Sequence, residues 1–556
     1  MNSLTYVTDP SMWEKFYKNM VNRNFNPYKY KNSKRINQTG RGLHGRYRGS
    51  YMIPVNVNAV EETEPMQGPT TMVSPVAAAE ERAFSQMKTE TAKPHVKIQK
   101  HIKRSRKHKI CVEYQKEKEV IMSFLSGDNK DIGQPQELSI FASPPNQVAV
   151  EKVTYTEERP ISNLIKDSTP IEIVVSGAGN DYIDLRKSRL YVKMQILKSD
   201  GTKLVDNEKT GIINLPLQSM FSHIDIYMNN KLISINSNNY PWKAYFKTIL
   251  SSGNDEQNSQ LQSQLFMKDD DPMDSVSLNS GIVNRIQFTQ DSRVFELEGN
   301  LLEDALQLDK YLISGVDIYM KLFRSNVPFL LMSEEISPSY KVKILDVFYR
   351  TARVKLDPGV IMNHRNEIQK SPAQYMITRS HVIQNVILKG STDFFWDAMF
   401  PKALPSKVVI GLVSQKAANG DYTANPFNFQ HFNMTNVTMK VNGVEVYGSP
   451  LSLDFGVNRN YAAAYVRLFE ISDKWLKDMG LNISLADFGK GYTFIVFSLD
   501  LCDFQEDYLN LVKHGNARLE IRFGSATSEI INCLCYYQSQ AILTCDETRD
   551  IKIVEP

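Results

Sequence analysis

The sequence predicts an all-β protein made of two tandem sandwich domains that follow the same plan. Three observations support this prediction: apolar residues alternate through most of the chain, one hairpin pattern occurs twice, and two further patterns recur in the same order. The chain has 556 residues, of which 42% are hydrophobic and 10% aromatic. This content is ample for two β domains of about 200 residues each.

Apolar and polar residues alternate through much of the last three quarters of the chain, with the two-residue period of a half-buried strand. In residues 188–196, Leu190, Val192, Met194 and Ile196 fall on one face. A similar strand-like pattern occurs in three other stretches, at 340–356, 407–413 and 530–537. Long polar stretches such as 251–264 separate the strands, and we expect them to be surface loops. Many strands and few helices favour a sandwich or jelly roll over a parallel sheet.

A hairpin pattern occurs twice, at residues 224–233 and 437–446. Each copy has three alternating apolar residues, a two-residue corner, and apolar residues again. The corners are Asn229-Asn230 and Asn442-Gly443. Asn and Gly tolerate the positive φ that two-residue hairpin turns require. Because hairpins are common in β proteins, this pair taken alone is also compatible with coincidence.

Two further patterns recur in the same order, which favours an internal duplication over coincidence. Residues 301–315 and 501–515 align without a gap, 200 positions apart, and each follows one strand-like run and precedes another. Between them and the hairpins lie two aromatic-rich stretches, 240–250 and 461–471, which we expect to be helical. The predicted organisation is a first domain over 122–338 and a second over 339–556, after an extension over 1–121.

Positive charge is concentrated in that N-terminal extension, although the formal net charge of the chain is only +3. Residues 15–50 hold ten Lys/Arg and no acid, with interleaved aromatics, and residues 93–109 hold eight Lys/Arg and no acid. Such runs suit phosphate neutralisation and base stacking on nucleic acid, and 103–109 also fits a nuclear-import patch. The candidate contacts are Arg41, Arg46, Arg48, Lys103, Arg104, Arg106, Lys107 and Lys109. We expect residues 1–121 to be a largely disordered, low-complexity arm, with a solvated tail lacking a specific partner as the alternative.

Motifs for catalysis are missing from the sequence, so we expect neither enzymatic activity nor a cofactor. It contains no GxxxxGK[ST], no HExxH and no GxSxG. Four carboxylates between Asp269 and Asp274 could hold a hard cation, although a solvated loop is the favoured interpretation. The odd count of five cysteines indicates free thiols in a reducing compartment. Cys533 and Cys535 share one face of a predicted strand, as two small core residues would.

The chain from residue 122 onwards also resembles a known family. The likeness includes ELSIFASPPNQ (137–147), DYIDLRKSRLYVKM (181–194), FSHIDIYMNNKLIS (221–234), NPFNFQHFN (425–433) and LVKHGNARLEIRF (511–523). In these stretches, which keep a consistent order, the chain resembles the major capsid proteins of Polinton/Maverick elements and the related adintoviruses. That family in turn is similar to adenovirus hexon and virophage capsid proteins.

The resemblance implies a tandem double jelly roll in a structural protein of the virion capsid. It further implies a homotrimer that forms a pseudo-hexameric capsomer of an icosahedral shell, with neighbouring capsomers, penton and minor capsid proteins as partners. Assembly in the host nucleus is suggested by the basic patch at 103–109, and no membrane span is expected.

Family members usually begin near the position of Met122, so residues 1–121 are additional. This extension could be a DNA-facing arm, a precursor segment removed in maturation, or a joined gene model. Two other classes of function stay open at this point: a jelly-roll carbohydrate-binding protein, and a nucleic-acid-binding protein that acts through the basic arm.

Overall fold

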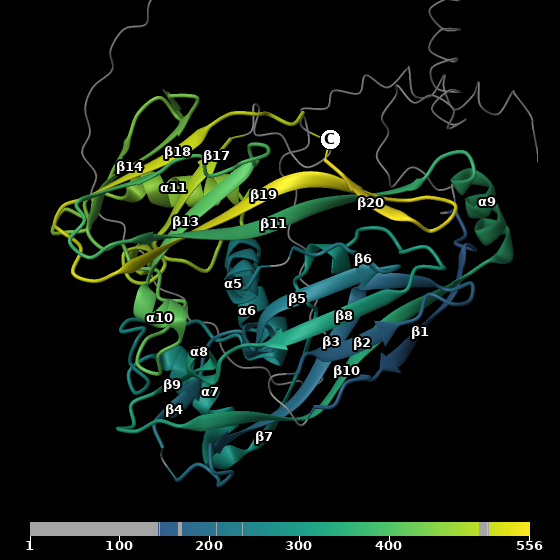
Figure 1. Cartoon of the computed structure of the whole chain (residues 1–556), viewed down its shortest axis with the longest axis horizontal. Helices are drawn as coiled ribbons and strands as arrows, with labels where there is room; N and C mark the ends of the chain where they lie inside the picture. The colour runs from purple at the N-terminus through teal and green to yellow at the C-terminus, as the bar shows by residue number, and fades with distance from the viewer. Residues whose placement is uncertain are drawn as a thin grey trace, which may run out of the picture. The chain divides into compact units, whose positions relative to one another are not determined.

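A computed structural model describes residues 143, 145–164, 169–206, 208–235, 237–499, 509 and 511–555. The predicted extension over 1–121, with all of its candidate nucleic-acid contacts, lies outside these residues. The described chain forms two jelly rolls, each built from two antiparallel sheets (Figure 1). The fold is therefore the expected double jelly roll.

The first roll has two four-stranded sheets, with the strand orders β1-β10-β3-β7 and β2-β8-β5-β6. The strands of the first sheet are β1 (Val150–Glu158), β10 (Tyr340–Leu356), β3 (Tyr182–Lys198) and β7 (Val294–Gly299). Those of the second are β2 (Ile171–Val175), β8 (Ile318–Arg324), β5 (Phe221–Met228) and β6 (Lys231–Leu232). The alternating residues of 188–196 that were expected on one face, from Leu190 to Ile196, are fully buried in β3.

The second roll has the strand orders β11-β19-β13-β17 and β12-β18-β14-β15. The strands of its first sheet are β11 (Ala373–Ile387), β19 (Ile531–Cys545), β13 (Lys407–Ser414) and β17 (Phe494–Ser498), and β20 (Ile551–Val554) also pairs with β19. Those of the second are β12 (Asp393–Trp396), β18 (Ala517–Phe523), β14 (Met434–Val441) and β15 (Val444–Glu445), and β16 (Leu451–Ser452) also pairs with β14.

The two rolls share one topology. When the eight main strands of each roll are numbered in chain order, both rolls have one sheet in the order 1-8-3-6 and the other in the order 2-7-4-5. The two hairpin patterns occupy equivalent places, as β5–β6 and β14–β15. The two aromatic-rich stretches form α5 (Tyr240–Ser251) and α11 (Ala462–Ile471), also at equivalent places in the chain. The repeat seen in the sequence is thus a repeat of the whole fold.

In the structure, the boundary between the two rolls lies further along the chain than the sequence predicted. Strand β10 pairs with β1 and β3 of the first roll, for example Tyr349 with Leu190. The division therefore falls between Leu356 and Ala373, at α9 (Pro358–Ile368), instead of at the expected boundary between 338 and 339. The pattern of 340–356 identifies a strand, but pattern alone does not identify the partners with which a strand pairs.

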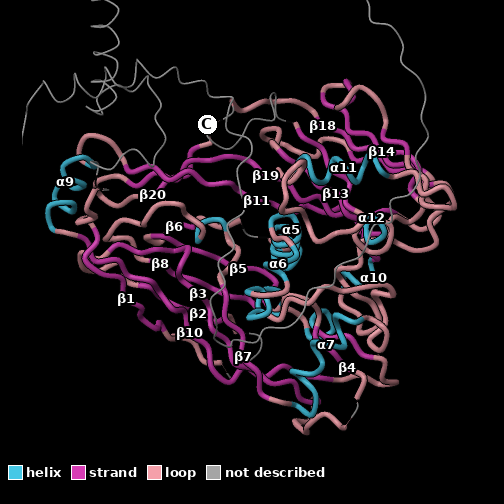
Figure 2. Tube along the Cα trace, turned by 180° about the vertical axis from the view of Figure 1, so that it is seen from behind, coloured by secondary structure: helices cyan, strands magenta, loops and turns pink. Residues whose placement is uncertain are grey.

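Short helices occupy the connections (Figure 2). They are α4 (Pro216–Ser219), α6 (Asn254–Gln257), η2 (Gln260–Gln264), α7 (Ser280–Thr289), η3 (Gln290–Ser292), η4 (Asp304–Leu306), α8 (Val327–Leu330), α10 (Gln415–Asn419) and α12 (Leu485–Phe488). A two-stranded sheet pairs β4 (Thr210–Ile212) with β9 (Leu331–Ser333). The polar stretch 251–264, expected to be a loop, contains α6 and η2. Among the described helices, none is both long enough and apolar enough to cross a membrane.

Candidate functional site

The two hairpin turns lie where the sequence pattern puts them, and all four turn residues have positive φ. The angles are 47° for Asn229, 66° for Asn230, 52° for Asn442 and 82° for Gly443. The Asn229 side-chain oxygen accepts the backbone N–H of Asp317 at 2.8 Å. The Asn442 oxygen accepts that of Asn516, also at 2.8 Å. Each turn is therefore fastened to the start of the strand beside it, which explains an asparagine at the first corner position of both copies.

Helix α5 of the first roll lies between the two rolls, against β11 and β19 of the second (Figures 1 and 2). Nine of its twelve residues are buried. Before the helix, the Asn239 side-chain amide donates to the backbone oxygen of Val382 at 3.0 Å. Within it, the Trp242 indole N–H donates to the backbone oxygen of Pro426 at 3.1 Å. Both polar groups are satisfied across the contact between the rolls, as buried donors require.

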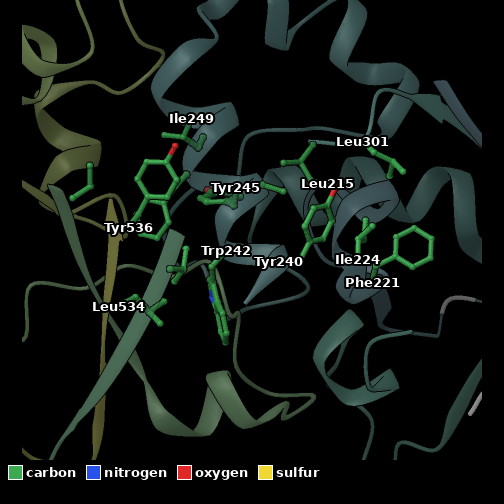
Figure 3. Packing of buried hydrophobic residues seen from close by; sticks show 14 of the residues in the cluster. Leu215, Phe221, Ile224, Tyr240, Trp242, Tyr245, Ile249, Leu301, Leu534 and Tyr536 are labelled. Atoms are coloured by element: carbon green, nitrogen blue, oxygen red, sulfur yellow. The ribbon is translucent and has the colours of Figure 1, made fainter. Parts of the chain in front are cut away.

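Aromatic side chains fill this contact. Tyr245 stacks on Phe427 with ring centroids 4.1 Å apart, and Phe246 lies 5.4 Å from Tyr536. In Figure 3, the side chains of Trp242 and Tyr245 from α5 lie towards Tyr536 of β19. Burying one such ring contributes about 1.5–3 kcal/mol, so these residues make the two rolls one packed unit instead of two loosely joined domains.

A buried ion network lies next to the aromatic cluster. The Lys243 ammonium is 2.9 Å from Glu303 and 3.0 Å from Asp304, and all three side chains are almost fully buried. Burial alone would lower the pKa of Lys243, but Asp304 and Glu303 outweigh it and raise that pKa. Burial would raise the pKa of Asp304, but Lys243 and Lys247 outweigh it and lower that pKa. Asp304 also accepts the backbone N–H of Ser380 in β11 at 2.8 Å, so the network reaches into the second roll.

The acidic stretch at 268–274 belongs to the same contact. Asp269 pairs with Arg285 at 2.7 Å, and both side chains are fully buried. The backbone oxygen of Asp269 accepts the Tyr492 hydroxyl of the second roll at 2.8 Å. The favoured interpretation of a solvated loop is therefore wrong at Asp269, because this residue is part of the packed interior.

The other three carboxylates of the stretch have separate protein partners. Asp270 accepts the backbone N–H and the hydroxyl of Ser280, Asp271 pairs with Lys490 at 3.2 Å, and Asp274 accepts the backbone N–H of Asn425 at 2.7 Å. In the described part of the chain, no three His, Cys, Asp or Glu side chains are grouped so that they could hold a metal ion. The acidic stretch instead joins the rolls, since Lys490 and Asn425 both come from the second.

The cysteines of β19 lie in the core of the second roll. Cys533 and Cys535 are fully buried and free, and burial raises the pKa of both thiols. This placement agrees with two small core residues. The candidate nucleic-acid contacts from Arg41 to Lys109 lie outside the described residues, so their role stays a prediction.

The residues that join the rolls were not predicted from the sequence. Some of them lie in the repeated stretches 240–250 and 301–315, and a dipeptide also recurs: Asn239-Tyr240 begins the α5 segment and Asn460-Tyr461 begins the α11 segment. Partners such as Asp304 and Ser380 are 76 positions apart in the chain, and no local pattern links them.

The sequence and the fold were compared with those of known proteins. No family model matches the sequence. An uncharacterized protein of Caenorhabditis elegans is 24% identical over 423 residues, which cover 73% of this chain and 98% of that protein. Among solved structures, a chain of the Sputnik virophage superposes with a TM-score of 0.52 at 11% identity, over 77% of this chain and 93% of that one. The mavirus major capsid protein gives a TM-score of 0.47 at 11% identity, over 76% and 95% of the two chains. The Sputnik chain thus shares the fold of this protein.

Proposed function

We propose that this chain is the major capsid protein of a Polinton/Maverick-type DNA virus or transposon. In this proposal three copies form a pseudo-hexameric capsomer, and capsomers tile an icosahedral shell. One observation carries the proposal: the chain contains two rolls of identical strand order, fastened into one unit by buried contacts. A ring of three such chains presents six similar sides to its lattice neighbours, whereas a ring of three chains with one roll each would present three.

Two further findings support the proposal. The sequence resemblance to Polinton/Maverick capsid proteins extends from residue 122 to the C-terminal region, in consistent order. The fold is also shared with a chain of the Sputnik virophage, which is a virus. The role is structural and involves no reaction, so its chemistry is that of protein–protein contact.

The proposal includes the location and partners of the protein. The chain resides in the virion shell, where it contacts neighbouring capsomers, penton and minor capsid proteins. Residues 1–121 contact packaged DNA through their basic side chains, and assembly takes place in the host nucleus. The basic composition of 15–50 and 93–109 supports these last two points.

Negative-stain images of the purified full-length protein test the proposal. We expect class averages with a hexagonal outline and six lobes of similar size, two from each chain. Isolated two-lobed particles would contradict it. A glycan array run on the same preparation separates the alternatives, because two-lobed particles that bind a sugar would favour a carbohydrate-binding protein.

A further inference from the structure

The first strands of the two rolls are equivalent but differ in how they are covered. Strands β1 and β11 each lie at the end of their sheet, so each has one free edge. A free edge presents unpaired backbone N–H and C=O groups, and proteins normally cover or block it. The structure shows how β11 is covered, and that contact suggests what covers β1.

Side chains of the first roll bind the free edge of β11. The Asn239 amide donates to the backbone oxygen of Val382, and Asp304 accepts the backbone N–H of Ser380. Residues 380 and 382 are two apart, so both direct their backbone groups to the same edge of an antiparallel strand. Ser380 and Val382 are 1% and 4% exposed. The segments that carry Asn239 and Asp304 therefore cover this edge at Ser380 and Val382.

Strand β1 has no comparable cover within the described part of the chain. None of its nine residues is buried. Val153 is 39% exposed and Tyr155 is 50% exposed, although both are apolar or aromatic. Apart from the local bonds between Gln147 and Val150, no hydrogen bond from the described residues reaches its free edge. A nine-residue edge strand that exposes an aliphatic and an aromatic side chain, Val153 and Tyr155, suits a partner that covers them.

The second roll carries the matching segment without a matching contact. Asn460-Tyr461 precedes α11 as Asn239-Tyr240 precedes α5. Only three of the ten residues of α11 are buried, against nine of twelve in α5. Asn460 is exposed, and the loop after α11 exposes Leu476 and Met479, the first almost completely.

We infer that the α11 segment of one copy docks on β1 of a second copy, with Asn460 as the counterpart of Asn239. This inference rests on the proposed function, because it names the surface by which the trimer closes. The Asn460 amide would donate to an outward backbone oxygen of β1, and apolar residues of the 472–480 loop would cover Val153 and Tyr155. The contact joins two different surfaces, so it can repeat around a ring, and the proposed capsomer requires that ring to close after three copies. The roll-to-roll contact within one chain then has the same plan as the contact between chains.

Two charge-introducing variants of the full-length chain test the surface, Tyr155→Asp on β1 and Asn460→Asp before α11. Ile336→Asp is the matched control, since Ile336 is fully exposed in the β9–β10 connection. We expect each test variant to raise the concentration at which half of the trimer dissociates by at least about ten-fold, with the control unchanged. The circular dichroism spectrum of the dissociated chain should match that of the parent, and each variant should melt in a single cooperative transition, which excludes misfolding.

A cross-link gives an independent measure. The double variant Tyr155→Cys/Asn460→Cys should form dimers and trimers on mild oxidation, in non-reducing gels, while neither single variant does. The native cysteines of the described residues are buried, and the single variants control for Cys111 and Cys502. A trimeric parent whose variants neither cross-link nor dissociate would overturn this surface and leave the capsomer standing. A monomeric parent would overturn both.

Discussion

Gly443 holds the second corner of its hairpin at a φ of 82°, in the left-handed region. A Cβ atom built at this position would meet no atom within 4 Å, so the space is open and only the backbone conformation is demanding. We expect Gly443→Val to destabilise the fold by about 1–3 kcal/mol, because a β-branched residue resists positive φ. Urea unfolding of the purified protein measures the change.

Gly443→Asn is the control for that substitution. Asn adopts positive φ readily, and Asn230 does so at the same corner of the first hairpin, with a φ of 66°. This variant should unfold close to the parent. Equal stability of Gly443→Val and the parent would show that the second corner does not need a residue that tolerates positive φ.

Protonation of His381 makes the stability of the fold depend on pH in the acidic range. Its ring stacks on Tyr537 with centroids 4.7 Å apart, and burial, together with Arg379 and Lys243, lowers its pKa to about 4. In the unfolded chain the histidine pKa is about 6.5. Because the folded pKa is the lower one, the neutral ring stabilises the fold above about pH 6.5, and this contribution is lost as the pH falls towards 4.

The variant His381→Phe keeps a ring for stacking but cannot bind a proton. We expect its melting temperature to fall less than that of the parent between pH 7 and pH 4.5, as measured by calorimetry. If the two proteins lost the same number of degrees over that range, protonation of His381 would not be a source of acid instability.

At the scale of elements, the α5 segment joins the rolls through the buried network around Lys243. Replacing Lys243 with Met leaves Glu303 and Asp304 buried without their main partner. Breaking a buried ion pair in this way costs about 3–5 kcal/mol. We expect that loss in urea unfolding, together with a broader transition in which the rolls unfold less cooperatively.

Lys370→Met provides the comparison, because Lys370 and Glu367 form a pair whose side chains are 68% and 66% exposed. Exposed pairs contribute about 0–1 kcal/mol. If Lys243→Met cost no more than Lys370→Met, the buried network would not be what fastens α5 to its surroundings.

The sequence predicts elements whose signals are local. The hairpin corners follow from Asn and Gly between alternating residues, and the buried face of β3 follows from Leu190 to Ile196. The pairing of those elements depends on contacts between distant parts of the chain. For this reason the sequence pattern of 340–356 indicated a strand but not its roll, and the acidic stretch did not reveal Arg285 or Tyr492 as partners of Asp269.

At the scale of the whole molecule, the contact between the rolls is the part of the candidate site that could not be predicted from the sequence. It needs the loop at 268–274, α5 and η4 from one roll and β11, β19 and Tyr492 from the other. The repeats at 240–250 and 301–315 mark segments that take part in it, but they do not show which residues of the other roll these segments contact. The proposed capsomer would require a rigid joint of this kind, because the two rolls of one chain would have to keep a fixed angle in the ring.

The basic N-terminal arm, residues 1–121, is proposed to bind DNA. We expect the full-length protein to bind double-stranded DNA with an affinity that falls steeply with salt, because Lys and Arg displace counterions from phosphates. Replacing Lys103, Arg104, Arg106, Lys107 and Lys109 with Ala should weaken binding and reduce the magnitude of the slope of log K against log salt by up to about 4.5. Fluorescence anisotropy over a salt series measures both. An unchanged slope would assign these residues to another role, such as nuclear import.

The mass of the full-length protein in solution, measured by light scattering on a size-exclusion column, tests the central claim most directly. One chain has a mass of 63.5 kDa. We expect a single peak at three times that mass. A peak at the mass of one chain would contradict the capsomer and leave a double jelly roll that acts alone.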